Sequence, residues 1–324
     1  MKYALPAIAV LASLPLFASG FHVTLATEIL IFALFAMSLD VQVGYARMLS
    51  FGHVAPYGIA AYSTAFALLH GIPLPAALLV GIAAAIVVAI PMGWLCTRAG
   101  GVAFAMLTLA FAQLAYAIAF KWNTVTGGSD GLSGLTRNIG PFGFSGFTSR
   151  NGYYWLTLAI VVVVLLIVQS FARSPMGTAI VAVRENEKRA RAIGYDPRAL
   201  RLAAFVVSNA VAGVAGALHA CSILYVSPEL LHWTLSGTVL VAAIVGGRGT
   251  LIGPMIGAAL IILASHNLSA LTDSWPLVMG ALFIVVVIAA PEGLWGLGLK
   301  VAKHQATRKQ GREAKAVGAP NAAS

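Results

Sequence analysis

The charged side chains between residues 172 and 201 have the types and spacing of a surface that binds another protein. Three basic residues recur at i, i+4 and i+7 and would share one face of a helix: Arg184, Lys188 and Arg191. Glu185 and Arg189 stand four positions apart, which is the spacing of an ion pair within a helix. A groove on a partner protein can bind such a helix by one face. The competing interpretation is a solvated loop whose charges only fix the orientation of the chain in a membrane.

Helix-terminating residues bound this charged stretch. Gly194 suits the position that follows a helix C-terminus, and Pro197 cannot continue a helix. We therefore predict one helix of about three turns from Val183 to Ile193. A second face of this helix carries a narrow stripe that would fit a partner's groove: Ile180, Val183, Glu187, Ala190 and Gly194. The ordered acidic and basic residues favour docking over the solvated loop.

The rest of the chain is apolar. Its 324 residues are 60% hydrophobic and only 9% charged, with a mean hydropathy of +0.90. Soluble domains carry about 25% charged residues, so lipid must be the main solvent of this chain. The net charge of +10 gathers in the 172–201 segment and after Leu299. Such clusters are typical of topology signals and of contacts with membrane lipid, and we expect no nucleic acid partner.

Ten apolar stretches approach the roughly 20 residues that a helix needs to cross a membrane. They are 3–19, 25–43, 53–69, 74–95, 101–120, 152–171, 202–223, 233–246, 251–266 and 275–293. The fold class is therefore all-α, a polytopic integral membrane protein with about ten (8–10) transmembrane helices. Two alternatives stay open: the short stretches 233–246 and 251–266 could form a re-entrant hairpin, and 3–19 could be a cleaved signal peptide.

The Lys and Arg residues orient these spans. With the 172–201 loop inside, alternation leaves three of the 20 basic residues outside: Lys121, Arg137 and Arg150. The spans before and after the loop then have opposite sense, which predicts an inverted repeat. We divide the chain into a transmembrane domain, 1–299, which contains the cytoplasmic loop 172–201, and a basic, disordered cytoplasmic tail, 300–324.

Several catalytic and cofactor motifs are absent from the sequence. It has no GxxxxGK[ST] phosphate-binding loop and no HExxH metalloprotease motif. No span carries a Ser, His and Asp set at helical spacing. We therefore expect no enzymatic activity, no metal and no cofactor in this chain. Glu28 and Asp40 lie near the ends of a span, and no span has a charge at mid-depth, which speaks against an ion-coupled carrier.

Glycine and proline interrupt the apolar pattern at 44–58 and at 245–254. Backbone groups freed by such breaks must find partners in protein or in a wet cavity, so breaks often line a substrate path. An ordinary polar turn would have the same composition. The candidates for the translocation path or gate are Ser50, Phe51, His53, Asn209 and Arg248, with interhelical bonding as the alternative for Asn209. Close helix packing is assigned to Gly249, Gly253 and Gly257, which recur every four residues.

Several motifs of this chain resemble those of a known family. They are Leu49-Ser50-Phe51-Gly52-His53, Leu107-Thr108-Leu109-Ala110-Phe111-Ala112, Thr126-Gly127-Gly128-Ser129-Asp130-Gly131-Leu132, Arg184-Glu185-Asn186-Glu187, Ala192-Ile193-Gly194, Leu202-Ala203-Ala204-Phe205, Tyr225-Val226-Ser227-Pro228, Gly246-Gly247-Arg248-Gly249-Thr250, Gly253-Pro254 and Pro291-Glu292-Gly293-Leu294. Over residues 25 to 295 the chain resembles the permease subunits of branched-chain amino acid (Liv-type, hydrophobic amino acid uptake) ABC importers. It is more similar to the longer of the two paralogous permeases.

The resemblance implies a set of partners. These are a second homologous permease, two ABC ATPase subunits that carry ATP and Mg, and a periplasmic or extracytoplasmic substrate-binding protein. It also implies that the segment around Arg184–Gly194 is the helix that couples to the ATPase, through Arg184, Glu185, Asn186, Glu187, Lys188, Ala190, Arg191 and Gly194. The chain departs from the family pattern at Arg47 and Arg248, where uncharged residues are usual.

The sequence thus predicts a multi-pass permease subunit in a bacterial plasma (inner) membrane, with a cytoplasmic C-terminus. It would move branched-chain or related amino acids into the cytoplasm, while partner subunits hydrolyse ATP. The alternatives are an ion-coupled secondary transporter, or the same importer class with urea, short amides or aromatic acids as substrate.

Overall fold

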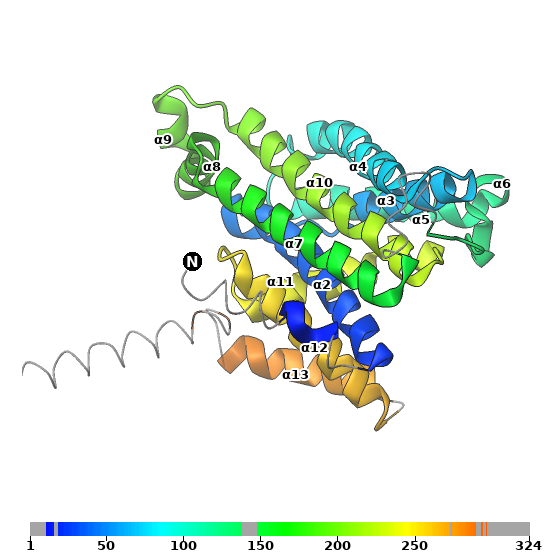
Figure 1. The fold of residues 1–324 in the computed structure, drawn as a ribbon. Coiled ribbons are helices and arrows are strands. Elements are labelled where there is room, and N and C mark those ends of the chain that lie inside the picture. Colours follow the sequence, from blue (N-terminus) through cyan, green and yellow to red (C-terminus); the bar gives the residue numbers. More distant parts are fainter. Residues whose placement is uncertain are drawn as a thin grey trace, which may run out of the picture.

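The protein is a bundle of packed helices (Figure 1). The computed structural model describes residues 11–15, 19–137, 148–272, 274–289, 293 and 296. The main helices are α2 (Gly20–Asp40), α3 (Val54–Leu69), α4 (Leu74–Cys96), α5 (Val102–Lys121), α6 (Asn123–Thr126), α7 (Arg150–Arg173), α8 (Pro175–Glu185), α9 (Glu187–Ala192), α10 (Pro197–Ile223), α11 (Trp233–Gly246), α12 (Ile252–Ser269) and α13 (Trp275–Ala289). A π-helical turn, η1 (Val41–Tyr45), extends α2. The described residues contain no β-strand, so the all-α fold class is confirmed.

Nine of the ten predicted spans coincide with helices, and the first, 3–19, lies mostly outside the described residues. Within the described part, six helical segments have the length and composition to cross a membrane. They are Gly20–Tyr45, Leu74–Cys96, Val102–Lys121, Arg150–Arg173, Pro197–Ile223 and Ile252–Ser269. The apolar helices α3 and α11 are shorter, with 16 and 14 residues, or about 24 and 21 Å at 1.5 Å per residue.

The packing of the helices follows the expected inverted repeat. If α2–α5 correspond to α10–α13, the two short helices α3 and α11 occupy equivalent positions. The first helix of each set packs against the second and third helices of the other: α10 lies against α3 and α4, and α2 lies against α11 and α12. The pairs α3–α4 and α11–α12 also match. Interrupted or short segments at equivalent positions of two repeats are a recurrent sign of a transport path.

Small residues allow this close packing. A Cβ added at Gly216 of α10 would collide with the backbone of Tyr57 in α3, and one at Gly213 would press on Ala85 of α4. In the second repeat, a Cβ at Gly257 of α12 would meet the carbonyl of Ala242 in α11. Small residues of α10 and α12 thus let the neighbouring helices approach closely, as predicted for Gly257.

The prediction for Gly249 is wrong in one respect. Gly253 and Gly257 lie on α12, but Gly249 belongs to the preceding turn, which spans 247–251, and shares no helix face with them. Gly249 has a φ of 78°, a backbone conformation that favours glycine. Its backbone lies directly against Gly44, whose own Cβ would collide with it. Gly249 therefore packs as a turn residue.

The glycine-rich segment after α5 is folded against the far end of α10. Leu132 and Val226 exchange both backbone hydrogen bonds, at 2.8 and 3.0 Å. The Tyr225 hydroxyl donates to the carbonyl of Asp130, and the Arg137 guanidinium donates to the carbonyls of Cys221 and Ser222. Two motifs far apart in the sequence, 126–132 and 225–228, thus form one structure.

The basic residues divide between the two ends of the bundle. One end, here called the basic end, comprises 45–50, 97–101, 173–201 and 247–251. Lys121 and Arg150 lie at the opposite ends of α5 and α7, beside the segment that holds Arg137. In Figure 1, α8 and α9 project at one extremity and α6 lies at the other. The basic residues are therefore separated into the two groups that the alternation of spans predicted.

The α11–α12 contact provides a stability test. Gly257→Ala should destabilise the protein by about 1–3 kcal/mol, because its methyl group has no space against the backbone of α11. Gly237→Ala on α11 is the matched control, since nothing lies within 4 Å of its added Cβ. Thermal unfolding of the detergent-purified protein measures both. Equal midpoints for the two variants would contradict close packing at Gly257.

Candidate coupling and transport site

The charged stretch forms two helices, so the prediction of one helix from Val183 to Ile193 is wrong. Helix α8 ends at Glu185, and α9 begins at Glu187. Asn186 between them is extended, with φ −155° and ψ 99°, and its side-chain oxygen accepts the backbone N–H of Arg189 at 3.0 Å. Asn is a preferred N-cap residue because it satisfies such a free N–H, and this preference outweighed the continuous helical pattern.

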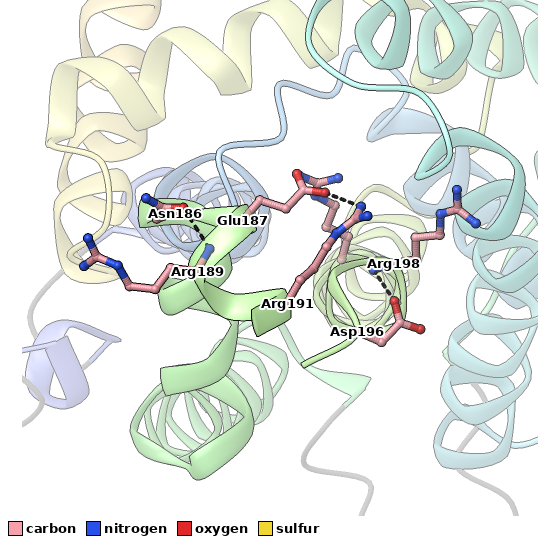
Figure 2. A network of polar contacts seen from close by, with 7 residues as sticks. Asn186, Glu187, Arg189, Arg191, Asp196 and Arg198 are labelled. Atoms are coloured by element: carbon pink, nitrogen blue, oxygen red, sulfur yellow. Dashed lines mark hydrogen bonds and ion pairs between the residues drawn. The ribbon is translucent and has the colours of Figure 1, made fainter. Parts of the chain in front are cut away.

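A carboxylate ties α9 to the start of α10. Glu187 accepts from Arg191 on its own helix and from Arg201 on α10 (Figure 2). Partial burial raises the pKa of Glu187, but the hydrogen bonds from Arg201 and Arg191 outweigh this effect and lower the pKa below its ordinary value. Arg184 pairs with its neighbour Glu185, and the structure shows no ion pair between Glu185 and Arg189 among the described residues.

The predicted docking residues divide into exposed and buried groups. Glu185, Asn186, Lys188, Arg191 and Gly194 are exposed, whereas Arg184 and Glu187 are half-buried. Ala190 is buried, and so are Ile180 and Val183. The stripe predicted to enter a partner's groove therefore packs against this chain's own bundle, because its apolar members have a core to join. Ala190 supports the segment from within and offers no contact surface.

Two apolar side chains on this segment were missed. Ile193 is 69% exposed and Tyr195 is 43% exposed, although both follow a run of charged residues at the tip of the molecule. Tyrosine is one of the residues that are enriched in binding hot spots. The sequence carried one signal for these side chains, because Ile193 and Tyr195 flank a glycine, and glycine favours a turn. In the structure Gly194 has a φ of 94° and the chain turns there.

The segment is anchored to the interruption after α2. The Arg184 guanidinium donates to the carbonyl of Gly44 at 2.7 Å, and α8 packs against η1. Ile180 joins a small core with Met48, Phe104 and Phe205. Direct contacts thus link α8 to the 41–50 segment.

Asp40 joins the two interruptions of the apolar pattern. It is fully buried, and its carboxylate accepts the backbone N–H of Gly249 at 2.6 Å and that of Leu251 at 3.0 Å. Asp40 ends α2 in the first repeat, and its partners lie in the 247–251 turn of the second. Arg248, a predicted gate residue, is exposed on this turn.

A buried polar cluster lies between α2, α3 and α10. His53 contacts Ser38 through Nε2 at 2.7 Å and the Gln42 amide through Nδ1 at 3.3 Å. Since an amide nitrogen can only donate, Nδ1 accepts and the ring proton is on Nε2. Gln42 also donates to Ser208 at 3.0 Å, and Ser208 donates to the carbonyl of Ser38.

Three buried oxygens in this region have no hydrogen-bond partner among the described residues: Gln42 Oε1, Ser50 Oγ and Asn209 Oδ1. The Asn209 amide donates to the carbonyl of Phe205 on its own helix, at 2.8 Å, and its side chain also interacts with His53 at the start of α3. Phe51 is bound through its backbone N–H to Thr108 of α5. Unsatisfied buried oxygens of this kind are expected where water or a polar solute passes. Of the predicted path residues, Ser50, Phe51 and His53 share one segment, Asn209 adjoins the His53 cluster, and Arg248 lies apart.

A family model described as the permease component of the branched-chain amino acid transport system matches residues 21–287. The chain belongs to this family. The match spans α2 to α13, including the interruptions joined by Asp40 and the α8–α9 segment. The protein is therefore a membrane permease component of a transport system.

Characterised relatives agree with this assignment. The high-affinity branched-chain amino acid transport system permease protein LivM of Escherichia coli K12 is 30% identical, with 90% of this chain and 74% of LivM covered. LivM of Salmonella typhimurium is 29% identical, with 93% and 76% covered. LivH of Escherichia coli K12 is 28% identical over 46% of this chain and 48% of LivH. No solved structure matches the chain.

The Asp40 clamp predicts a specific loss of stability. In Asp40→Asn an amide NH2 group replaces one of the two acceptor oxygens, and this group can only donate. One of the two buried backbone N–H groups therefore loses its acceptor, at a cost of about 1–3 kcal/mol. Thermal unfolding of the purified protein measures this loss. Asp130→Asn is the control, because Asp130 is exposed at the opposite end. An unchanged midpoint for Asp40→Asn would show that the clamp does not hold the two repeats together.

The Glu187 bridge predicts local loosening of α9. Glu187→Gln should raise hydrogen exchange of the α9 amides up to about fivefold, because partly exposed ion pairs stabilise by about 1 kcal/mol or less. Folding lowers the pKa of Glu187, so the bridge contributes stability above the pKa that Glu187 has in the unfolded chain. This stability is lost as the pH falls through the lower pKa of the folded state, and acid should therefore have the same effect as the substitution. Glu229→Gln, an exposed residue at the other end, should leave α9 unchanged. If neither Glu187→Gln nor acid changes the hydrogen exchange of the α9 amides, the bridge does not stabilise α9.

Proposed function

We propose that this chain is the membrane-spanning permease subunit of an ATP-binding-cassette importer for branched-chain amino acids. The observation that carries the proposal is the α8–α9 segment, which projects from the basic end and exposes Ile193 and Tyr195 among charged residues. Within a transport permease, such a surface is suited to receive force from a soluble motor. The names of the relatives supply the substrate class.

The partners follow from the same family. A second homologous permease pairs with this chain, two ABC ATPase subunits bind ATP and Mg and dock on α8–α9, and an extracytoplasmic binding protein delivers substrate to the opposite end. The basic end faces the cytoplasm of a bacterial cell, and the C-terminus lies on the same side. Hydrolysis takes place on the ATPase subunits, and this chain converts their movement into alternating access.

The contacts at the basic end describe how movement would pass inward. A displacement of α9 is carried to α10 by Glu187 and Arg201, and to the 41–50 segment by Arg184 and Gly44. Asp40 carries it on to the second repeat. An ATPase shifts the conformational equilibrium only by as much as it binds the two states differently, so a rigid connection between motor and gate is needed.

An uptake assay in reconstituted vesicles tests the proposal against its rival. With the full importer, uptake of leucine should require ATP and survive an uncoupler that collapses ion gradients. Uptake that persists without ATP and stops with the uncoupler identifies an ion-coupled carrier. Competition by valine, urea, short amides and aromatic acids then determines the substrate class.

The docking surface has its own test. Ile193→Ser should lower ATP-driven leucine uptake at least about tenfold, because it removes the exposed apolar anchor of α8–α9. Ala192→Ser changes the neighbouring exposed residue without removing an apolar anchor and should transport normally. Membrane insertion, measured by the amount of protein in the membrane fraction, should be equal for both. Normal uptake by Ile193→Ser would exclude this anchor from ATPase docking.

A further inference from the structure

A cavity at the basic end is built from four separate segments. It has a volume of about 260 Å³. It lies between the 46–49 turn, the 99–101 turn with Phe104, the α8–α9 junction and the start of α10. Its charged lining consists of Arg47, Arg184, Glu187 and Arg201, and its apolar lining includes Met48, Phe104 and Val183.

Of the three guanidinium groups that line the cavity, two have hydrogen-bond partners. Arg184 and Arg201 are engaged by Glu185, Gly44 and Glu187. Arg47 is exposed and makes no hydrogen bond or ion pair with any residue that the structure describes, although the Glu185 carboxylate attracts it from a distance. Its φ of 54° places it in the left-handed region, which costs energy for a side chain with a Cβ. An arginine held in this way, at the rim of a cavity with excess positive charge, is suited to bind an anionic group.

We propose that this cavity binds the imported amino acid on the cytoplasmic side, with its carboxylate on Arg47. The proposal rests on the proposed function, which supplies the substrate class. Glu187 accepts from two arginines, but a carboxylate has about four acceptor sites, so it can also accept from an ammonium group. Met48, Phe104 and Val183 form a short apolar wall for a branched side chain. The volume of about 260 Å³ is well above what a single water needs, so the cavity has room for a small solute.

Occupancy would oppose transport. A bound amino acid would connect the 46–49 turn to the α8–α9 junction, beside the hydrogen bond by which Arg184 already holds Gly44 of η1. The extra contact holds these segments in one arrangement, so turnover slows as product accumulates inside. The apolar lining formed by Met48, Phe104 and Val183 is short and lies among three arginines and a glutamate, which favours a small zwitterion over the two acyl chains of a phospholipid.

Binding to the full chain tests the cavity directly. In phosphatidylcholine nanodiscs without ATP or binding protein, radiolabelled L-leucine should bind, and leucinamide, which lacks the carboxylate, should bind at least tenfold more weakly. Arg47→Gly and Arg47→Asn should each weaken leucine binding at least tenfold, since both residues accept a positive φ and neither carries charge. Arg98→Gln is the control, because Arg98 stacks on Trp94 and does not line the cavity.

Several results would overturn the proposal. Equal leucine binding by wild type and both Arg47 variants removes Arg47 from the site. Competition by inorganic phosphate as strong as that by leucine makes it a general anion site. Loss of leucine binding in phosphatidylglycerol nanodiscs assigns the cavity to a lipid headgroup.

An uptake arm separates this proposal from the proposed function. In vesicles preloaded with leucine, ATP-driven uptake by the wild-type importer should fall severalfold relative to empty vesicles, and Arg47→Gly should lose this inhibition. If uptake is driven by ATP but leucine neither binds in nanodiscs nor inhibits uptake from inside, the proposed leucine site is wrong and the proposed importer function stands. Leucine binding without ATP-driven uptake by any variant rejects the importer instead.

Discussion

The pair of hydrogen bonds from the buried Asp40 carboxylate to the backbone of Gly249 and Leu251 is the interaction on which the architecture depends. In lipid, a helix that stops short leaves polar backbone groups that only protein can satisfy. The apolar pattern is interrupted once in each repeat at the basic end, and each interruption supplies what the other lacks: a carboxylate in the first, free N–H groups in the second. The glycines at 44 and 249 let the two backbones come close enough for this exchange. The two interruptions therefore form a joint, which here means the hydrogen-bonded contact between Asp40 and the 247–251 turn. This contact stabilises a polar region between the two repeats.

The joint also explains why the charged segment can act on the core. Arg184 reaches the carbonyl of Gly44, one turn from Asp40, and Ile180 packs with Met48 in the same segment. Force applied to α8 thus reaches both repeats through a few short contacts. The helices themselves are packed too closely to deform, since glycines such as Gly216 and Gly257 leave no space between backbones. Movement is consequently expected as displacement of whole helices about the interruptions, in the manner of a hinge.

Sequence periodicity and charge predicted most of the fold, because nine apolar stretches became helices and the basic residues separated to the two ends. They failed where a single side chain decided the outcome. Asn186 divided the predicted helix because it caps α9. An asparagine can either continue a helix or cap a new one, and the helical pattern does not show which of the two occurs. Gly249 kept the four-residue spacing of a packing motif but belongs to a turn, since Asp40, more than two hundred positions away, binds its N–H. The candidate path residues Ser50 and His53 were found through the break in the pattern. Ser38, Gln42 and Ser208, which surround His53, were missed because isolated polar residues inside apolar spans carry no local signal.

The division of the charged segment at Asn186 bears on how coupling can work. A continuous helix from α8 through α9 would expose the same residues on a single rigid rod attached to α7. With the break, α8 is fixed to η1 through Arg184 and packs through Ile180 against Phe205 of α10, while α9 is fixed to α10 through Glu187 and Arg201. The segment therefore contacts both repeats, because η1 extends the first helix of one repeat and α10 is the first helix of the other. A motor that holds the tip at Ile193 and Tyr195 therefore acts on both repeats at once. Alternating access requires the repeats to move relative to each other, and a segment that contacts both repeats and is divided at Asn186 is placed to drive that movement.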